Sequence, residues 1–495
     1  MSVTTDNQSA AVREIKHTPS RMRNPFGKWK VHRSSVCIGC GTCTEKCPHG
    51  VFHRFSRSGK PIRPKDYLCR GHGCSLCVDN CPAGALVVKR NPIYSTIGDF
   101  RWTPDLILST WDMAENGRIT DDSIETDLGN SDGGFDKLRL NFPDRPAEKL
   151  EPGDIDTTLE LNRRGEGGTQ IKIDVPWYGG GMSYGSVSPA TMVGKAHAAR
   201  IWNTFTCTGE GGYPPHLYPY DDNVITQVAT GLFGVREETV QRVRMVEFKY
   251  AQGAKPGLGG HLLGDKNTPA VAKMREAVPG TSLFSPFPFH SVYSIEDHKK
   301  HIDWILAMNP AALVSSKVST PTDVDMVAVG SYYAGSHVVH IDGSYGGTGA
   351  APDIAKKNIA MPIEYAIPKV HDFLVDEGIR DRITLIASGG IRNAHDIVKS
   401  ICLGADGVVV GTSELVALEC IRCGNCESGR GCARGIATTD PELSTFFDIE
   451  WSTRRIVNMY NAWREQIVDI LVRFGLSSVS ALRGRTDLLT HVDYS

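Results

Sequence analysis

Twelve consecutive residues, Cys37-Ile-Gly-Cys40-Gly-Thr-Cys43-Thr-Glu-Lys-Cys47-Pro48, space four cysteines as C-x2-C-x2-C-x3-C-P. This spacing suits a cubane iron–sulfur cluster, because short turns let three thiolates converge while the proline directs the fourth away. A second run follows between Cys69 and Pro82, with two extra residues after its first cysteine. In paired runs the fourth cysteine of each ligates the other run's cluster. We therefore predict one cluster held by Cys37, Cys40, Cys43 and Cys81, and another held by Cys69, Cys74, Cys77 and Cys47.

The alternative for these cysteines is a pair of zinc ribbons. Zinc sites of that kind use two C-x2-C pairs, not three cysteines followed by a Cys-Pro. The spacing therefore favours two clusters that move single electrons. We expect residues 31–92 to form a ferredoxin-like α+β domain with two [4Fe–4S] clusters, behind a polar arm over residues 1–30.

Composition narrows the classes of function. The chain has 495 residues, of which 40% are hydrophobic and 22% charged, as is ordinary for a soluble globular protein. A net charge of −2 gives no support for nucleic-acid binding. No apolar run approaches the roughly 18 residues of a membrane span, and the first residues lack the apolar core of a secretory signal. Twelve of the fourteen cysteines lie in tight clusters, which indicates metal sites in a cytoplasmic protein and not disulfides.

From about residue 169 the chain alternates short apolar strands with helices. Helices are expected over 237–244, 295–308, 362–377 and 393–403, and strand ends at 175–181, 204–209, 246–250, 282–285, 312–317, 338–343, 383–389 and 408–411. Eight such strands predict a (β/α)8 TIM barrel over residues 169–440. An open doubly wound sheet is the alternative, but no GxGxxG follows an early strand. We expect residues 93–168 to be a linker or wrapping segment. Residues 441–495 should close the domain with one or two amphipathic helices over 452–489.

A third cysteine cluster follows the last predicted strand. It comprises Cys420, Cys423, Cys426 and Cys432. Four thiolates at this spacing suit a [4Fe–4S] cluster, or a [3Fe–4S] cluster with one cysteine spare; a structural zinc loop is the alternative. The loop after the eighth strand lies where a TIM barrel binds its cofactor, so a cluster there would relay electrons into the barrel.

Glycine-rich loops after the seventh and eighth strands predict a phosphate site. Ser388-Gly389-Gly390 and Gly411-Thr412 offer bare backbone amides in the two loops where TIM barrels commonly hold phosphate. Beside an electron-transfer module this favours a flavin. Lys317 ends another strand, and its ammonium could stabilise the negative region of a reduced flavin.

Two single residues near the strand ends have plain alternatives. Cys207 is more simply a buried strand thiol than a nucleophile. His340 could contact flavin or substrate, or be a hydrogen-bonded structural histidine.

Six motifs make the chain recognisable. In order they are Gly181-Met-Ser-Tyr-Gly185, Thr208-Gly-Glu-Gly-Gly212, Gln252-Gly-Ala-Lys-Pro-Gly257, Tyr293-Ser-Ile-Glu-Asp297, Gly343-Ser-Tyr-Gly-Gly-Thr-Gly-Ala350 and Ser388-Gly-Gly390. Over residues 175–489 the chain resembles the FMN domain of glutamate synthases. With its fused ferredoxin domain it resembles the synthase subunit of the split, archaeal-type enzyme. In that family reduced FMN transfers hydride to 2-iminoglutarate, which forms from 2-oxoglutarate and ammonia.

The resemblance implies roles for individual residues. Glu210 would be the acid/base of imine formation, and Gln252, Lys255 and Arg275 would bind the substrate carboxylates. Cys420, Cys426 and Cys432 would match the ligands of the family's three-iron cluster. FMN would be held by Met182, Ser183, Lys317, Gly346, Gly347, Gly389, Gly390, Gly411 and Thr412.

Three departures from the family pattern concern the substrate and the last cluster. Leu258-Gly-Gly-His261 replaces Glu-Gly-Gly-Gln, two phenylalanines, Phe287 and Phe289, enter the Ser-Pro-Pro-Pro-His-His-Asp motif, and Cys423 is an additional thiol. The first two changes motivate another acceptor, as in N-methylglutamate synthases. A non-enzymatic electron relay in a larger complex is the third hypothesis.

No amidotransferase nucleophile or nicotinamide fingerprint is present in the sequence. Ammonia is therefore expected from a glutaminase (amidotransferase) subunit. Electrons are expected from a NAD(P)H–flavin subunit or a ferredoxin, in a hetero-oligomer.

Overall fold

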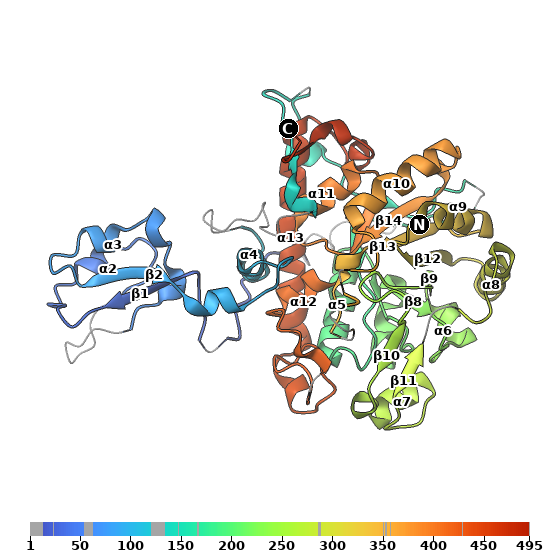
Figure 1. Cartoon of the computed structure of the whole chain (residues 1–495), viewed down its shortest axis with the longest axis horizontal. Coiled ribbons are helices and arrows are strands. Elements are labelled where there is room, and N and C mark those ends of the chain that lie inside the picture. Colours follow the sequence, from blue (N-terminus) through green and yellow to red (C-terminus); the bar gives the residue numbers. More distant parts are fainter. Residues whose placement is uncertain are drawn as a thin grey trace, which may run out of the picture.

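The computed structural model describes residues 13–22, 24–53, 63–119, 134–146, 148–165, 168–285, 289–349, 351, 354–356, 358–427 and 429–494. Its amino-terminal module is a small α+β unit that stands apart from the main body in Figure 1. Strand β1 (Trp29–Arg33) pairs antiparallel with β2 (Leu86–Arg90). Short helices α2 (Thr42–Lys46) and α3 (Leu76–Asp79) lie within the two cysteine runs. The module is centred on a few apolar side chains: Val31, Val51, Phe52, Leu86 and Val88.

The main body is a barrel of parallel strands. Within the described residues its strands are β6 (Trp177–Gly179), β7 (Thr206–Cys207), β8 (Val224–Val228), β9 (Met245–Lys249), β12 (Leu313–Ser319), β13 (Val338–Asp342), β14 (Thr384–Ser388) and β15 (Gly407–Val410). The strands are hydrogen-bonded in the order β6-β15-β14-β13-β12-β9-β8-β7. The first and last strands also meet, because the Gly179 amide donates to the Phe205 carbonyl at 2.8 Å and Gly181 pairs with Cys207. The predicted TIM barrel is confirmed.

One predicted barrel strand is wrong and one was missed. Residues 282–285 form β11 (Leu283–Ser285), which pairs antiparallel with β10 (Gly260–Leu262) in a hairpin outside the barrel. The barrel strand that the pattern did not reveal is β8, five buried residues between β7 and β9. A 3-10 turn with an internal proline, Pro215–Asn223, precedes β8 in place of a helix, so the strand–helix alternation breaks there.

Helices surround the barrel on its outer side. Helices α6 (Glu237–Arg242), α8 (Ile295–Met308), α10 (Ile363–Asp376) and α11 (Ala394–Cys402) fall within the four predicted ranges. The others are α5 (Pro189–Ile201), α9 (Val324–Ala334), α12 (Thr412–Ala417) and, in the long connection after β9, α7 (Pro269–Arg275). None of the described helices is long and apolar enough to cross a membrane.

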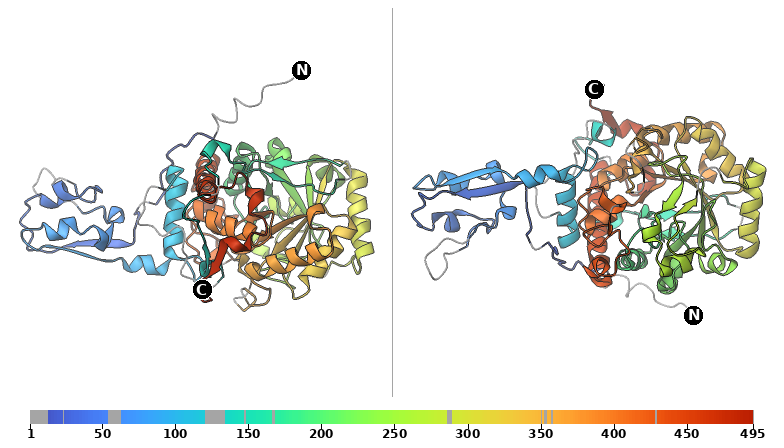
Figure 2. Two further views of the ribbon diagram at one scale, coloured as in Figure 1. Left: turned by 90° about the horizontal axis from the view of Figure 1, so that it is seen from above. Right: turned by 60° about the horizontal axis from the view of Figure 1, so that its bottom comes forward.

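The segment between module and barrel is structured and does more than link. It holds α4 (Pro104–Asn116), whose ends are capped by Thr103 and Gly117 and whose buried face packs on the long helix α13 (Ile449–Phe474). Both views of Figure 2 place α4 between the module and the barrel. The hairpin of β4 (Leu159–Glu160) and β5 (Lys172–Ile173) puts its apolar side chains against the interior residues at the strands' amino ends. This hairpin therefore closes the bottom of the barrel.

The carboxyl-terminal region contains one long α-helix, in agreement with the one or two that were expected. Helix α13 begins after the capping residue Asp448 and ends at Gly475. It packs against α5, α4 and α11, with Trp463 and Tyr460 stacked on each other and both edge-on to Trp177 of the barrel. The chain then runs to a short strand, β16 (Leu489–His491), which pairs with β3 (Leu138–Leu140).

Candidate functional site

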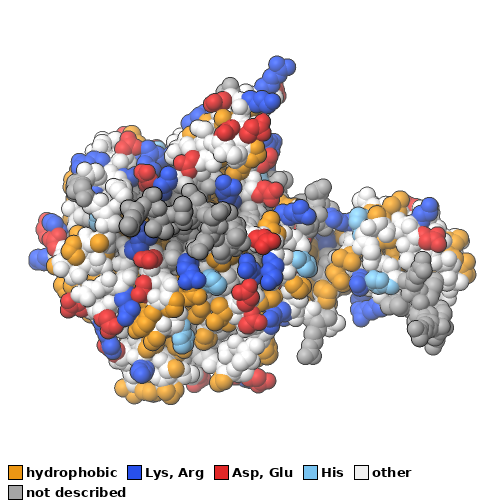
Figure 3. Space-filling model, turned by 180° about the vertical axis from the view of Figure 1, so that it is seen from behind, with side chains coloured by type: hydrophobic (Ala, Val, Ile, Leu, Met, Phe, Trp, Pro, Cys, Tyr) orange, Lys and Arg blue, Asp and Glu red, His pale blue; other side chains and the backbone are white. Residues whose placement is uncertain are grey.

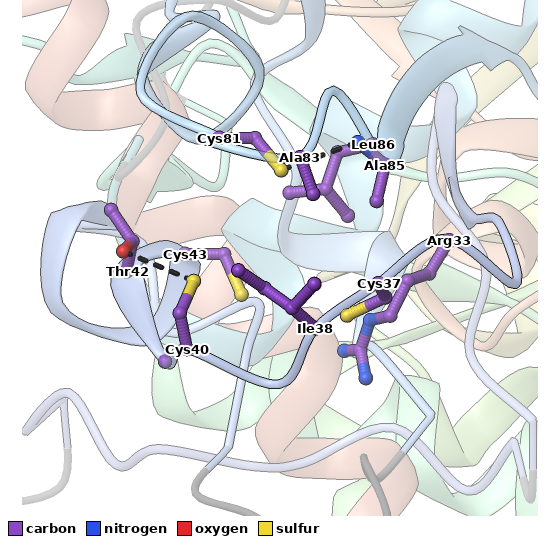
Figure 4. A pocket seen from close by; sticks show the side chains of 11 residues that line it. Arg33, Cys37, Ile38, Cys40, Thr42, Cys43, Cys81, Ala83, Ala85 and Leu86 are labelled. Carbon is purple, nitrogen blue, oxygen red and sulfur yellow. Dashed lines mark hydrogen bonds between the residues drawn. The ribbon is translucent and has the colours of Figure 1, made fainter.

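The two sets of cysteines that the spacing predicts as cluster ligands each line a pocket of the module. Cys37, Cys40, Cys43 and Cys81 line one pocket, where Figure 4 shows their side chains around a shared space. Cys47, Cys69, Cys74 and Cys77 line a second pocket. Each set takes three cysteines from one run and the fourth from the other. Burial raises the pKa of the Cys77 thiol to about 11, so a bound metal centre is what would hold such a sulfur as thiolate. The donor sets fit two iron–sulfur clusters.

The two pockets differ in their distance along the module from the barrel. The register pairs Trp29 with Arg90 and Arg33 with Leu86. The first pocket includes Arg33 and Leu86, at the end remote from the barrel. Near the second pocket, His72 packs edge-on against Trp29, and the neighbouring Lys28 pairs with Asp105 of α4 at 3.1 Å. We call the pockets the outer and the inner cluster site respectively.

The third cysteine cluster lies against the segment that leaves the module. Cys420 is packed among apolar side chains of residues 97–107 and α12, and burial raises its pKa to about 12. The Gly98 amide donates to the Ile421 carbonyl at 2.9 Å. Cys426 and Cys432 lie close enough to Cys420 to oppose its ionisation, whereas Cys423 is exposed. This loop therefore lies between the module and the barrel.

The loops after β13, β14 and β15 meet at the carboxyl end of the strands, here called the mouth. Gly389 and Gly390 have φ of +101° and +106°, and a Cβ on Gly389 would lie 2.5 Å from the Gly343 carbonyl oxygen, so glycine is required there. The Thr412 hydroxyl donates to the Gly346 carbonyl at 3.4 Å. The structure thus brings together residues that the sequence placed at a flavin phosphate, and their backbone amides suit an anion.

Beneath these loops Lys317 is a buried cation. Burial opposes its charge, but Asp342, whose carboxylate is 3.5 Å away, and Glu247 raise its pKa above the usual value. Lys317 is therefore an ammonium at neutral pH. A cation held in a buried position beside the glycine loops fits the electronic demand of a reduced flavin.

His340 is a satisfied structural histidine, one of the two alternatives considered. Its Nδ1 lies 3.0 Å from Glu247 and its Nε2 lies 2.7 Å from the Ser388 hydroxyl. Ser388 in turn donates to Asp342 at 2.6 Å. Burial acts to raise the pKa of Glu247, but His340, Lys317 and hydrogen bonds lower it to about 2. These hydrogen bonds fix the side chains of Glu247, His340 and Asp342 relative to one another inside the barrel, next to Lys317.

The predicted substrate residues lie together at the mouth. Glu210 follows β7, and its Oε2 is 3.3 Å from Nζ of Lys249 at the end of β9. Lys255 is buried; desolvation and the like charge of Lys249 lower its pKa to about 8, although Glu210 acts in the opposite direction. Arg275, from α7, donates to the Ser183 hydroxyl at 2.9 Å, and burial lowers its pKa. Two lysines and an arginine around one carboxylate can hold a dicarboxylate.

Lys249 was not predicted. It is the last residue of β9 and pairs in register with Lys317 of β12, so a lysine near the carboxyl end of a barrel strand is the signal that could have found it. Gln252 is half-buried in the loop after β9, between Lys249 and Lys255 in sequence. Met182 is half-buried in the loop after β6, next to Ser183. Cys207 is a buried strand thiol, and burial raises its pKa to about 12.

The departures from the family pattern occupy different surroundings. Burial and the charge of Lys255 lower the pKa of His261, while Glu427 acts in the opposite direction. The Leu258 side chain is 45% exposed. Phe289 is buried against Phe248 and Tyr250, away from solvent. Phe287 lies outside the described residues.

These features define an iron–sulfur oxidoreductase built on a TIM barrel. The module has two cluster sites, a third cysteine cluster lies against the barrel, and the mouth is cationic and lined by glycines. Comparison with known proteins makes the class narrower. The conserved region in glutamate synthase matches residues 134–477, and the 4Fe–4S dicluster domain matches residues 36–86. The chain belongs to the glutamate synthase family, whose members are iron–sulfur flavoprotein oxidoreductases, and the resemblance drawn from its motifs is confirmed.

Several archaeal-type relatives span nearly the whole chain. The archaeal-type glutamate synthase (NADPH) of Thermotoga maritima is 36% identical over 485 residues, covering 92% of this chain and 93% of its own. The archaeal glutamate synthase (NADPH) of Methanocaldococcus jannaschii is 36% identical over 486 residues, with the same coverage. The glutamate synthase (NADPH) large chain of Azospirillum brasilense is 36% identical over 318 residues, 63% of this chain and 21% of its own. The chain thus has the extent of the archaeal-type enzymes.

Proposed function

We propose that this chain is the synthase subunit of a glutamate synthase and makes L-glutamate from 2-oxoglutarate and ammonia at the barrel mouth. The observation that carries the proposal is the set of Glu210, Lys249, Lys255 and Arg275 beside the glycine loops. FMN, when bound, would supply the two electrons that reduce the C=N bond. Met182, Ser183, Lys317, Gly346, Gly347, Gly389, Gly390, Gly411 and Thr412 would hold it.

Lys255 and Arg275 would bind the two carboxylates of the substrate. Arg275 can offer parallel N–H donors, and its buried Nε has no hydrogen-bond partner among the described residues, which leaves a donor for a carboxylate oxygen. Lys255, with its pKa near 8, gains charge stabilisation when a dianion enters. Gln252 would add a neutral donor at the edge of the site.

Glu210 would carry the protons of imine formation. Ammonia adds to the keto carbon of 2-oxoglutarate and water leaves, so one group must take a proton from nitrogen and give one to the departing oxygen. The Glu210 side chain is nearly buried, and an ion pair with Lys249 holds its carboxylate in place. The same residue can therefore serve both transfers from one position.

Electrons would arrive one at a time through three clusters. The outer site, bordered by the exposed Val36 and Ile38, would receive them, and the inner site would pass them toward the third cluster. Figure 3 shows the module projecting from the barrel with hydrophobic side chains on its outer end, where a donor protein could dock. The hydrogen bond between Gly98 and Ile421 joins the segment that leaves the module to the loop of the third cluster.

For the third cluster we propose a [3Fe–4S] centre ligated by Cys420, Cys426 and Cys432. Its support is the exposure of Cys423 and the mutual proximity of the other three. The proposed clusters are then two [4Fe–4S] and one [3Fe–4S]. A cytoplasmic setting suits free thiols in such numbers.

The proposed partners are a glutaminase (amidotransferase) subunit that delivers ammonia and a NAD(P)H–flavin subunit or ferredoxin that delivers electrons, in a hetero-oligomer. The NADPH in the names of the archaeal-type relatives supports the nicotinamide-dependent donor. Copurification of the tagged chain from its own cells, followed by mass spectrometry, identifies these subunits.

His261 is the observation that favours a second candidate function, in which the acceptor substrate differs. Its ring lies among the charges of Lys255, Glu210 and Glu427, where the family pattern has glutamine, and this change favours a different acceptor as the second candidate. The deciding assay offers the reduced enzyme either 2-oxoglutarate with ammonia or glutamate with methylamine as oxidant pair. Glutamate synthesis predicts fast flavin reoxidation only with the first pair. Fast reoxidation only with the second would establish an N-methylglutamate synthase, and none with either would favour an electron relay.

A further inference from the structure

The glycine loops at the mouth lack a cation of their own. A flavin phosphate carries about −1.5 to −2 charges at neutral pH, and Ser388-Gly-Gly-Ile391 and Gly411-Thr-Ser-Glu414 contain no lysine or arginine. Arg392, which follows Ile391 of the first loop, is fully buried and already binds two carboxylates. It donates to Asp136 at 2.5 and 3.0 Å and to Asp396 at 2.7 Å. A cationic side chain from elsewhere in the chain would therefore add charge stabilisation to that of the backbone amides.

Arg101 is positioned to provide that charge. It comes from the segment between the module and the barrel and is 3% exposed. Its Nε and Nη2 both lie 3.2 Å from the point where a Cβ on Gly390 would stand, and its guanidinium stacks 4.2 Å from the ring centre of Tyr345. The arginine thus lies against two of the loops that form the proposed flavin site.

The hydrogen bonding of Arg101 is incomplete among the described residues. Nη2 donates to Glu364 at 3.4 Å, at the limit of a hydrogen bond, and Nε has no acceptor. A buried donor without an acceptor is costly, and more so on a charged group. A phosphate oxygen at the Gly390 loop would supply the missing acceptor.

We propose that Arg101 binds the phosphate of FMN through Nε and Nη2, so that the segment joining the ferredoxin-like module to the barrel forms part of the flavin site. This inference rests on the flavin site of the proposed function and deepens it. It assigns Arg101 a role beyond the residues of the family motifs, because none of those motifs includes it.

A second arginine faces the same loops from the cluster side. Nη1 of Arg422 lies 2.9 Å from the Cβ position of Gly347, which is also 3.3 Å from the Thr412 hydroxyl. Arg422 is held there by Asp99, two residues before Arg101, through bonds of 2.6 and 3.2 Å. The segment that carries Arg101 therefore contacts both the glycine loops and the loop of the third cluster, where the Gly98 amide donates to the Ile421 carbonyl.

The test measures the affinity of the deflavinated, cluster-containing protein for FMN and for riboflavin, which lacks the phosphate, by quenching of flavin fluorescence. Arg101→Met should raise the Kd for FMN about 10- to 100-fold, as expected for a lost charge-assisted hydrogen bond, and leave the Kd for riboflavin unchanged. Arg101→Lys keeps the charge and should show a smaller loss, again confined to FMN. If the Met variant does not fold, the Lys variant carries the test.

Two matched variants separate phosphate binding from support of the fold. Glu364→Gln removes the carboxylate next to Arg101 and should leave FMN binding equal or tighter. Arg145→Met changes an exposed arginine of the same segment and should alter nothing. Equal losses for FMN and riboflavin in the Arg101 variants, or losses in Glu364→Gln as large as in Arg101→Met, would overturn the proposal. A wild-type protein that binds neither flavin would instead overturn the proposed function itself.

Discussion

Replacing Glu210 with glutamine removes the proposed acid/base group while keeping its shape. The Glu210 side chain is 10% exposed, and its Oε2 lies 3.3 Å from Nζ of Lys249, so a glutamine amide fits the same space and keeps a carbonyl oxygen toward that lysine. The flavin loops are formed by other residues and should keep their cofactor. What is lost is the ability to take up and release a proton next to the substrate nitrogen.

The loss of a general acid/base typically lowers the rate by about 10²- to 10⁴-fold, which corresponds to about 3 to 5 kcal/mol of barrier. Stopped-flow absorbance separates two half-reactions. Reduction by dithionite should proceed at the wild-type rate in Glu210→Gln, because it tests only the clusters and flavin. Reoxidation by 2-oxoglutarate with ammonia should slow by the stated factor.

Glu276→Gln is the matched control, since Glu276 is a surface carboxylate paired with Arg236 outside the site. It should behave as wild type in both half-reactions. Reoxidation of Glu210→Gln at the wild-type rate would refute the acid/base assignment. Slowed reduction in the same variant would show instead that the substitution disturbs electron delivery.

Three further predictions address the clusters, the substrate and the fold. Metal analysis of the anaerobic protein should find about eleven iron atoms and one FMN per chain, and Cys423→Ser should keep the paramagnetic resonance signal of the oxidised third cluster; a lost signal would make that thiol a ligand. The pKa of Lys255 is about 8, and its charged form binds the dianion. KM for 2-oxoglutarate should therefore be flat below pH 7 and rise above about pH 8. Lys255→Arg stays charged, so a KM that still rises with pH in this variant would exclude Lys255 as the titrating group. Arg392→Met removes the ion pairs that one buried guanidinium makes with Asp136 and Asp396, and it should cost about 3–5 kcal/mol of unfolding free energy in thermal melts. Arg485→Met, at an exposed pair, should change Tm little.

Local spacing carried the parts of the site that lie close together in sequence. The two groups of cysteines that line the outer and inner cluster sites could be predicted from short runs, because turns of two or three residues leave few ways to bring thiolates together. Helices α8, α10 and α11 were predicted from the sequence, and α8 and α11 begin at the capping side chains Ser294 and Asn393. Membership of the family followed from ordered motifs in the loops of one barrel.

The helix α4 shows where such signals were present but not sufficient. Thr103-Pro104 and Gly117 mark its start and end, yet its role appears only when it packs between the module and α13. Strand β8 was lost for the opposite reason, because the turn before it contains a proline and no helix, while residues 282–285 have strand-like composition without a barrel position.

What the sequence by itself determined, then, is which residue types stand at fixed spacing: the cluster cysteines, the glycine loops and the motifs of the family. Only the tertiary structure placed Lys249 against Glu210, set the pKa of Lys255 and brought Arg101 to Gly390. These contacts join residues tens to hundreds of positions apart. Burial and charge depend on distances in space, so no local pattern encodes them, and the closed barrel is what makes them neighbours.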